Sequence, residues 1–344
     1  MTHLAGGLAT DELVKITLLG LVAFLIATLL TPIYTYFAYK HKFWKVQKSV
    51  DVSGEKLAVM NKLHQAKIAR HIPTMAGLIL VLTVIAATIL WNFSRAQTWI
   101  PLAALGGGAL VGLIDDVINL RSTGGVAGLR APIKFALIAL GGLLLGWFFC
   151  AKLGWTQIKI PFAGYWDLGV WLIPVFAFIV VATGNAVNIT DGLDGLAGGL
   201  AAEAFTVFAV IALLQGNYGV AAFCFTILGA LLSYLWFNIY PARFFMGDTG
   251  SLALGLALGA VAMMTNSLLL LPVIGLVFVV EAGSSLIQIF SKKFFHKKIF
   301  ISAPLHHHLE AIGWPEPKIT MRLWVIGAVC GVIGLVLALA GGVI

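Results

Sequence analysis

Between residues 184 and 195 the chain reads Gly184-Asn185-Ala186-Val187-Asn188-Ile189-Thr190-Asp191-Gly192-Leu193-Asp194-Gly195, with apolar stretches on either side. The 344-residue chain is 60% hydrophobic and only 10% charged, and its mean hydropathy is +0.99. Apolar stretches of about 20 residues are typical of membrane-spanning helices. Carboxylates kept between such stretches are costly, so this polar run indicates a functional site.

The chain contains ten apolar stretches long enough to be considered as spans. They are 13–36, 74–92, 99–118, 132–150, 168–184, 195–214, 218–237, 251–265, 269–290 and 322–342. The first stretch is too long for a signal-peptide core and lacks a small-residue cleavage site, so we expect it to be a retained helix. The sequence therefore predicts an all-α, polytopic integral membrane protein with about ten transmembrane helices, forming one membrane-embedded domain over residues 1–344.

The basic residues predict the orientation in the membrane. With an even number of spans both termini lie on one side, and placing them outside puts 18 of the 22 Lys and Arg residues in inner loops. The net charge of +8 follows largely from this asymmetry and is not the pattern of a nucleic-acid-binding protein. The three cysteines have no paired spacing and predict neither a disulfide nor a metal site.

Polar side chains gather at the inner ends of the predicted spans. Four segments contribute: Asp115-Asp116, the run 185–194, Asn238 with 241–251, and the histidine block 304–310. A secondary transporter, which ten spans with glycine-rich helices would also suit, should instead place its polar residues near the middle of the membrane. The pattern favours an enzyme with one site at the inner face of the bilayer.

Three aspartates are candidates for metal binding or proton transfer. Acids at a helix C-terminus oppose the helix dipole, so Asp115 and Asp116 need a functional reason. Adjacent carboxylates bind a divalent cation or shift one another's proton affinity so that one becomes a base. Asp248 follows Gly247 at the predicted start of a helix, where its carboxylate suits Mg²⁺ and nearby N–H groups suit phosphate. Helix capping is the structural alternative for Asp248.

Asp191 and Asp194 would share one helix face if they begin the sixth span, with capping again the alternative. The three consecutive histidines at 306–308 cannot readily all reach one tetrahedral zinc ion. We expect one or two of them to face phosphate and the rest to be structural. No phosphate-binding Lys loop, serine-hydrolase elbow or dinucleotide fingerprint is present in the sequence.

In their order along the chain, these motifs resemble those of the polyprenyl-phosphate N-acetylhexosamine-1-phosphate transferases. The resemblance covers Pro73-Thr74-Met75, Asp115-Asp116, Asn188 to Asp194, Asn238 with Pro241-Ala242, Phe245 to Ser251, Glu281 to Gln288, and His306 to Glu310 followed by Gly313-Trp314. The Pro-Leu-His-His-His-x-Glu form is similar to the muramoyl branch. The chain departs from the family pattern at Lys67 to Gly77, where the lysine is displaced and a Gly-Thr pair is missing, and at Asn119, where a lysine is common.

The resemblance implies transfer of phospho-MurNAc-pentapeptide from UDP-MurNAc-pentapeptide to undecaprenyl phosphate, giving lipid I and UMP with Mg²⁺ as cofactor. The alternative on the same scaffold is transfer of GlcNAc-1-phosphate from UDP-GlcNAc. The implied location is the inner membrane of a bacterium, with the active site facing the cytoplasm. The family also suggests a homodimer in the lipid bilayer.

The resemblance also implies roles for individual residues. The catalytic set is Asp115, Asp116, Asp248 and His306, with the three aspartates also as metal ligands. The substrate-binding set is Lys67, Thr74, Lys134, Asn188, Asp191, Asp194, Asn238, Phe245, Gly247, His307 and His308. We expect Asp115 to take the last proton of the acceptor phosphate, with Asp116 holding metal or orienting its neighbour, and Phe245 to stack on uracil unless it only packs against lipid. An aspartate that forms a phospho-enzyme is the competing route.

Overall fold

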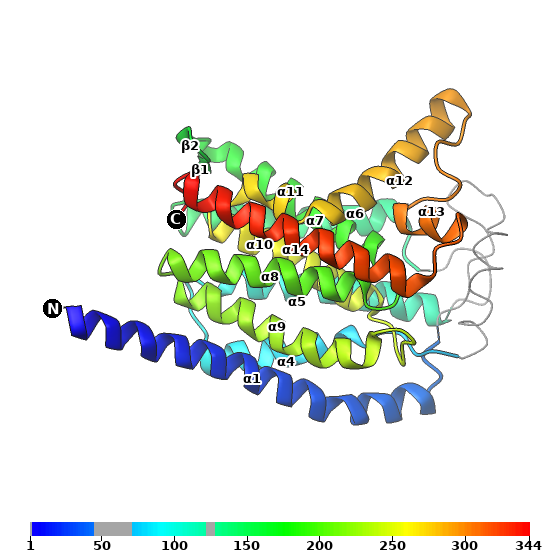
Figure 1. Cartoon of the computed structure of the whole chain (residues 1–344), viewed down its shortest axis with the longest axis horizontal. Coiled ribbons are helices and arrows are strands. Elements are labelled where there is room, and N and C mark those ends of the chain that lie inside the picture. Colours follow the sequence, from blue (N-terminus) through cyan, green and yellow to red (C-terminus); the bar gives the residue numbers. More distant parts are fainter. Residues whose placement is uncertain (1, 45–70, 122–127) are drawn as a thin grey trace.

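The structure is a computed structural model that describes residues 2–44, 71–121 and 128–344, with side chains from residue 10 onward (Figure 1). The predicted site residue Lys67 lies outside the described residues. The α-helices are α1 Thr2–Lys40, α4 Gly77–Trp91, α5 Trp99–Arg121, α6 Ala131–Ala151, α7 Leu172–Thr190, α8 Leu196–Leu214, α9 Tyr218–Asn238, α10 Gly247–Met264, α11 Leu271–Ile274, α12 Leu276–Phe295, α13 Leu305–Ala311 and α14 Glu316–Ala340.

Each of the ten predicted apolar stretches coincides with a helix or a broken helix. In the described part of the chain eight helices are long and apolar enough to cross a membrane, and α11 with α12 make a ninth if the bent pair is one span. The shorter apolar helix α4 has 15 residues. The number of long apolar helices confirms an all-α, polytopic protein. A helix suits the membrane because its backbone hydrogen bonds are satisfied within the segment.

The end of one helix differs from the sequence-based prediction. Helix α7 continues to Thr190, six residues beyond the predicted end of its span at 184. Residues 185–190 of the polar run are therefore helical. Asp191 and Asp194 lie in the turn that joins α7 to α8, so the interpretation that they share a face of the sixth span is wrong. Helix α10 begins at Gly247, ahead of its apolar stretch at 251–265, so Asp248 lies at the start of the helix as predicted.

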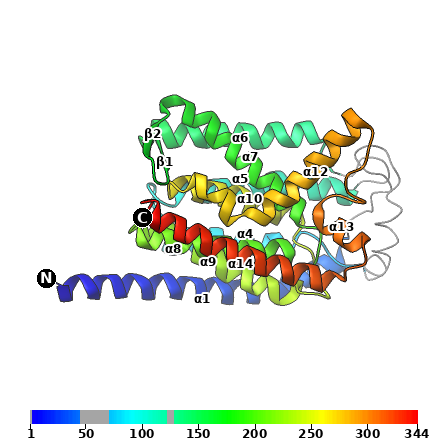
Figure 2. The ribbon, with the colours of Figure 1, turned by 45° about the horizontal axis from the view of Figure 1, so that its top comes forward.

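Helix α10 lies at the centre of the helix bundle, and 94% of its residues are buried (Figure 2). Three neighbours approach it closely through glycines. A Cβ atom on Gly77 of α4 would lie 2.3 Å from Gly250 Cα, one on Gly112 of α5 2.1 Å from Asp248 O, and one on Gly184 of α7 2.4 Å from the Leu256 side chain. Small residues at these contacts let membrane helices pack tightly, and here they hold the helix that carries Asp248.

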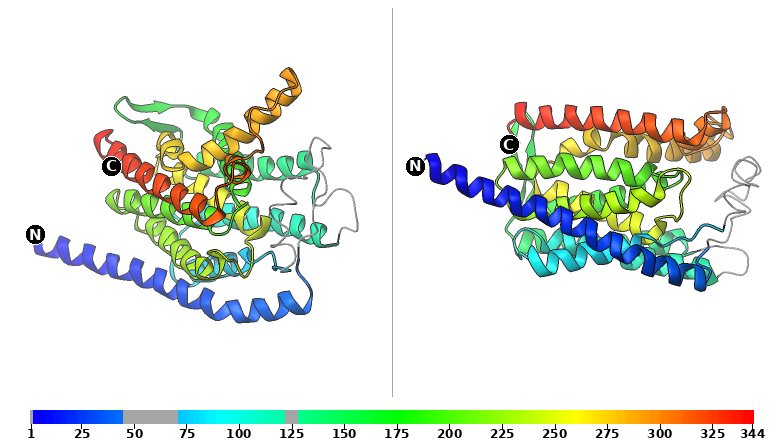
Figure 3. Two further views of the ribbon diagram at one scale, coloured as in Figure 1. Left: turned by 45° about the vertical axis from the view of Figure 1, so that its right-hand side comes forward. Right: turned by 60° about the horizontal axis from the view of Figure 1, so that its bottom comes forward.

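Both chain termini lie at the end of the bundle opposite α13 (Figures 1 and 3). A hairpin that the sequence did not predict, β1 Gln157–Ile160 and β2 Gly164–Asp167, is attached at this end by a hydrogen bond from Phe162 N to Gly341 O. Its strands are antiparallel, with Gln157 opposite Asp167 and Ile160 opposite Gly164. The shared position of the termini agrees with an even number of spans.

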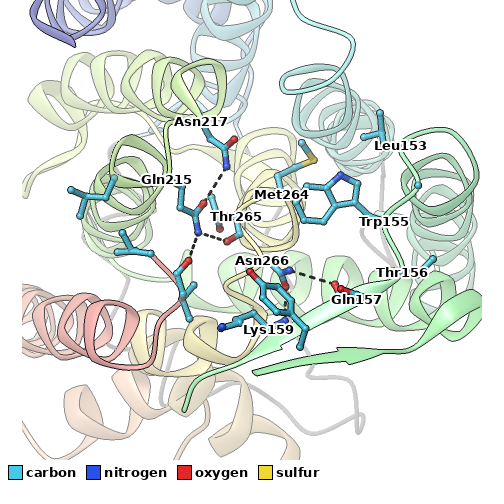
Figure 4. Close-up of a pocket in the computed structure, with 15 residues that line it drawn as sticks. Leu153, Trp155, Thr156, Gln157, Lys159, Gln215, Asn217, Met264, Thr265 and Asn266 are labelled. Atoms are coloured by element: carbon cyan, nitrogen blue, oxygen red, sulfur yellow. Dashed lines mark hydrogen bonds between the residues drawn. The ribbon is translucent and has the colours of Figure 1, made fainter. Parts of the chain in front are cut away.

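An open cavity of about 780 Å³ lies beside the hairpin (Figure 4). Gln215 Nε2 donates to the carbonyls of Thr265 at 2.8 Å and Val343 at 2.9 Å, and Asn266 Oδ1 accepts from Lys159 N at 2.7 Å. These amides join the hairpin, helix ends and C-terminal segment to one another. The residues that line the cavity include none of the predicted site residues.

At the other end, the chain breaks at Gly275 and α12 leaves the bundle at 81° to the preceding residues 268–274 (Figure 1). The outer part of α12 exposes large apolar side chains, among them Phe290, Phe294 and Phe295. Glu281 lies on the opposite, buried side of the same helix. The bend thus brings one face of α12 over the histidine helix α13 and leaves the other face uncovered by protein.

Candidate active site

Three charged side chains converge where α5, α6 and α10 meet. The Lys134 ammonium is hydrogen-bonded to Asp248 Oδ2, and its Nζ lies 3.8 Å from Asp115 Oδ2. Their side chains are only 15%, 14% and 9% exposed for Lys134, Asp248 and Asp115. A lysine placed between two carboxylates in a largely enclosed site compensates their charge, which would otherwise be costly to bury.

The segment before α6 surrounds Asp115. Leu129 N–H donates to Asp115 Oδ1 at 2.8 Å. The preceding Gly128 has φ +90°, and a Cβ atom there would lie 2.9 Å from both carboxylate oxygens. Glycine is needed at this position both for the left-handed backbone and for the close approach. The segment therefore fixes Asp115 and starts α6 so that Lys134 reaches the site from its first turn.

Asp116 contacts the beginning of α10 with both oxygens. Oδ1 accepts from Asp248 N at 3.2 Å, and Oδ2 accepts from Thr249 N at 2.9 Å and Thr249 Oγ1 at 2.8 Å. The backbone N–H groups of residues 248 and 249, which were predicted to suit phosphate, therefore bond to Asp116 in this structure. A carboxylate from another helix stabilises the positive end of α10 and holds Asp248 in place.

Four predicted substrate-binding residues come from α7, α9 and the turn after α7. Asn188 Nδ2 donates to Ser251 Oγ at 2.8 Å and so joins α7 to the first turn of α10. Asp191 is half-buried in the turn. Asp194 and Asn238 are buried and support loops: Asp194 Oδ2 accepts from Ala242 N at 3.0 Å, and Asn238 Oδ1 accepts from Gly195 N at 2.9 Å.

The Pro73-Thr74-Met75 motif pairs with the segment that leads into α10. Phe245 N donates to Pro73 O at 2.8 Å, and Ala76 N donates to Phe245 O at 3.0 Å. Thr74 has no exposed surface, and its Oγ1 would lie 3.0 Å from a Cβ atom placed on Gly247. Thr74 thus lies beneath the Gly247 turn, whereas Phe245 is half-buried beside it.

The three consecutive histidines of α13 have different partners. His306 Nδ1 lies 2.9 Å from Glu281 Oε2, and His307 Nδ1 lies 2.7 Å from Glu310 Oε2. His308 Nδ1 accepts from Ile301 N at 3.3 Å. His306 is fully buried, and His307 is 8% exposed. Different surroundings for each ring are consistent with the expectation that only some of the histidines face substrate.

Three glutamates were given no role by the sequence-based reasoning. Glu281 and Glu310 bind histidines, and Glu316 Oε1 accepts from Asp194 N at 2.6 Å. Glu281 had a recognisable signal, since it is an acid inside the apolar stretch 269–290. Glu310 stands three residues after His307, a spacing that lets side chains meet on a helix. Glu316 had no such local signal, because its partner is 122 residues away.

The oxygen donors at the site fit Mg²⁺. Mg²⁺ is usually held by one or two carboxylates together with substrate phosphates, rather than by a cage made only of protein. Asp115 and Asp248 supply two such carboxylates on either side of Lys134. Within the described ranges no group of three or more His, Cys, Asp or Glu side chains forms a metal site by itself. The geometry therefore suits an ion shared with a phosphorylated substrate.

The chain is similar to known proteins over nearly its whole length. Residues 98–266 match the model of glycosyl transferase family 4. A phospho-N-acetylmuramoyl-pentapeptide-transferase from Chloroflexus aggregans is 37% identical over 96% of this chain and 92% of its own length. Proteins of the same name from Geobacillus thermodenitrificans and Anoxybacillus flavithermus are each 40% identical over 91% of this chain and 95% of theirs. This coverage takes in most of the chain on both sides of the family match.

Proposed function

The chain belongs to the family of phospho-N-acetylmuramoyl-pentapeptide transferases, and from this premise we propose that it transfers phospho-MurNAc-pentapeptide from UDP-MurNAc-pentapeptide to undecaprenyl phosphate. The products are lipid I and UMP. The observation that carries the proposal is the convergence of Asp115, Lys134 and Asp248 at the ends of apolar helices. A polyprenyl acceptor requires a site that opens to the bilayer, and a nucleotide donor requires one that opens to water.

The reaction exchanges one phosphorus–oxygen bond for another. An oxygen of the acceptor phosphate attacks the donor phosphorus that bears the sugar, and the bond from that phosphorus to the bridging oxygen breaks, so that UMP leaves with this oxygen. Asp115 takes the remaining proton of the acceptor phosphate. Lys134 offsets phosphate charge, since phosphoryl transfer depends mainly on positioning and charge stabilisation. We favour direct attack over a phospho-enzyme because the acceptor is already an anionic nucleophile.

Asp248 and Asp115 would hold the Mg²⁺ ion. When bound there, the ion would neutralise charge on the transferred phosphate. Asp116, which was also a predicted ligand, has hydrogen bonds to α10 through both oxygens. We therefore propose that Asp116 contributes mainly by fixing the helix start from which Asp248 projects.

We further propose that the site faces the cytoplasm of a bacterial cell. The inward bias of basic residues supports this orientation, since 18 of 22 lie in the predicted inner loops. A nucleotide-linked donor is also a cytoplasmic type of substrate. A homodimer is a further expectation from the family resemblance, and native mass spectrometry of the detergent-purified protein would test it.

The proposed reaction is tested by UMP release from the purified protein with undecaprenyl phosphate and Mg²⁺. We expect turnover with UDP-MurNAc-pentapeptide, none with UDP-GlcNAc, and loss of turnover when EDTA removes the metal. Omission of undecaprenyl phosphate should abolish UMP release completely, including any first-turnover burst. Turnover with UDP-GlcNAc alone would contradict the proposed donor. A stoichiometric UMP burst without acceptor would contradict direct attack.

A further inference from the structure

Two fully buried side chains connect α12 with the histidine helix. Glu281 and His306 each have no exposed surface. His306 Nδ1 lies 2.9 Å from Glu281 Oε2, and the His306 backbone N–H donates to the same oxygen at 3.3 Å. A carboxylate oxygen only accepts hydrogen bonds, so Nδ1 carries the hydrogen in this contact. The carboxylate therefore sets both the tautomer and the orientation of the ring.

The opposite edge of the His306 ring abuts the turn between α7 and α8. Its Nε2 has no hydrogen-bond partner among the described residues. A Cβ atom on Gly192 would lie 2.2 Å from Nε2 and 2.9 Å from Cε1. Gly192 directly follows Asp191. The imidazole thus packs against the backbone of this turn, at a distance that only glycine permits.

The neighbouring His307 shows that this enclosure is not a general property of the histidine block. His307 has its own carboxylate, Glu310, at 2.7 Å, but keeps 8% of its surface exposed. The rings of His306 and His307 lie with centroids 4.1 Å apart. A ring with no exposed surface does not touch substrate directly, and the Nε2 edge of this ring meets the backbone at Gly192. His306 therefore acts on the site through the Asp191 turn.

We propose that Glu281 is a positioning residue that holds the His306 ring against Gly192 and so keeps the Asp191 turn in the conformation that receives the nucleotide donor. This inference rests on the proposed function and on the substrate-binding role that the family resemblance implies for Asp191, which we take to be toward the nucleotide donor. Without Glu281, the His306 Nδ1–H group has no acceptor in an enclosed site, and the ring must move to find one. The effect falls on the donor and leaves acceptor binding unchanged.

Steady-state kinetics of three variants in the full chain test the proposal. Glu281→Gln retains an oxygen that accepts from Nδ1–H, so its KM for UDP-MurNAc-pentapeptide should stay within about threefold of wild type. Glu281→Leu lacks an acceptor and should raise that KM by about tenfold, with the KM for undecaprenyl phosphate unchanged. The control is Glu203→Gln, a half-buried acid of α8 whose Oε2 faces Gly327. It should change neither KM.

Hydrogen–deuterium exchange of the peptide spanning residues 190–196 provides a reading that does not depend on activity. Exchange there should rise in Glu281→Leu, and also in Gly192→Ala, because a Cβ atom would displace the ring. If Glu281→Leu does not fold, the two single variants Gly192→Ala and Glu281→Gln test the positioning role. Unchanged exchange in Gly192→Ala, or an equal rise in both KM values, would overturn the positioning role. If the wild-type protein released no UMP, the proposed function would be refuted. The exchange data would still test the contact between the His306 ring and Gly192.

Discussion

At the scale of single residues, four aspartates divide by what their carboxylates contact. Asp115 and Asp248 face Lys134, whereas Asp116 and Asp194 accept backbone N–H bonds from distant segments. In the proposed reaction, the first pair would exchange the contact with Lys134 for contacts with metal or substrate. In the second pair, Asp116 holds the start of α10 and Asp194 holds a loop, so the removal of either should cost stability as well as activity.

Asp248→Asn tests the first group. The amide keeps the size of the side chain but loses the charge that pairs with Lys134 and would bind Mg²⁺. We expect kcat to fall by about a hundredfold or more. The Tm in detergent should stay close to that of wild type, because the amide fills the same space and Asp115 remains beside the Lys134 ammonium to compensate its charge. Near-normal turnover at ordinary Mg²⁺ concentration would rule out the role of Asp248.

Much of this residue-level division could not be predicted from the sequence. The resemblance pointed to both kinds of aspartate, and residues such as Lys134 and Asp248 do meet in space. The sequence does not tell a substrate-facing acid from a loop-supporting one, because the deciding partners are far away in the chain. Asp116 contacts residues 132 and 133 positions later, and Asp194 contacts Ala242, 48 positions later.

At the scale of helices, the position of α10 depends on close contacts with its neighbours. Apolar length alone predicted every spanning segment, since the membrane imposes about 20 apolar residues per helix. It did not predict the hairpin after α6, the break before α12 or the extra turns of α7. Those features depend on local hydrogen bonding and on tertiary contacts that hydropathy does not encode.

Substitution of Gly112 tests the contact between α5 and α10. Gly112→Ala would place a Cβ atom 2.1 Å from the Asp248 carbonyl oxygen, which is backbone and cannot rotate away. We expect a loss of about 1–3 kcal/mol in stability, measured as a lower Tm in detergent, together with reduced turnover as Asp248 is displaced. The matched control is Gly107→Ala on the same helix, where no atom lies within 4 Å of the added Cβ. Equal effects of the two substitutions would contradict a specific contact at Gly112.

At the scale of the whole molecule, the hairpin and the termini lie at the end of the bundle opposite α13 (Figure 1). The charged site lies at the other end of the helices, where α5 ends and α6 and α10 begin. If the site faces the cytoplasm, the hairpin must face outward. Its exposed Phe162 and the exposed Lys297 after α12 are suitable reporters for the two ends.

Cysteine labelling in a background with Cys150, Cys224 and Cys330 replaced by alanine tests this arrangement. In intact spheroplasts a membrane-impermeant maleimide should label Phe162→Cys at once. Lys297→Cys should react only after the membrane is permeabilised. The reverse pattern would mean that both the orientation and the proposed cytoplasmic site are wrong.

The enclosure of α10 has a consequence for how this protein can change over evolution. Neighbouring helices surround α10, whereas only 22% of the most apolar part of α6 is buried. Lipid accepts apolar side chains of many shapes, but a packed interior accepts few. A saturation mutagenesis library selected for growth should therefore retain very few alleles along 247–264 and many along the outward face of 131–151. During evolution, substitutions in this enzyme would accumulate on the lipid-facing surfaces of its outer helices, while the sequence of α10 would change very little.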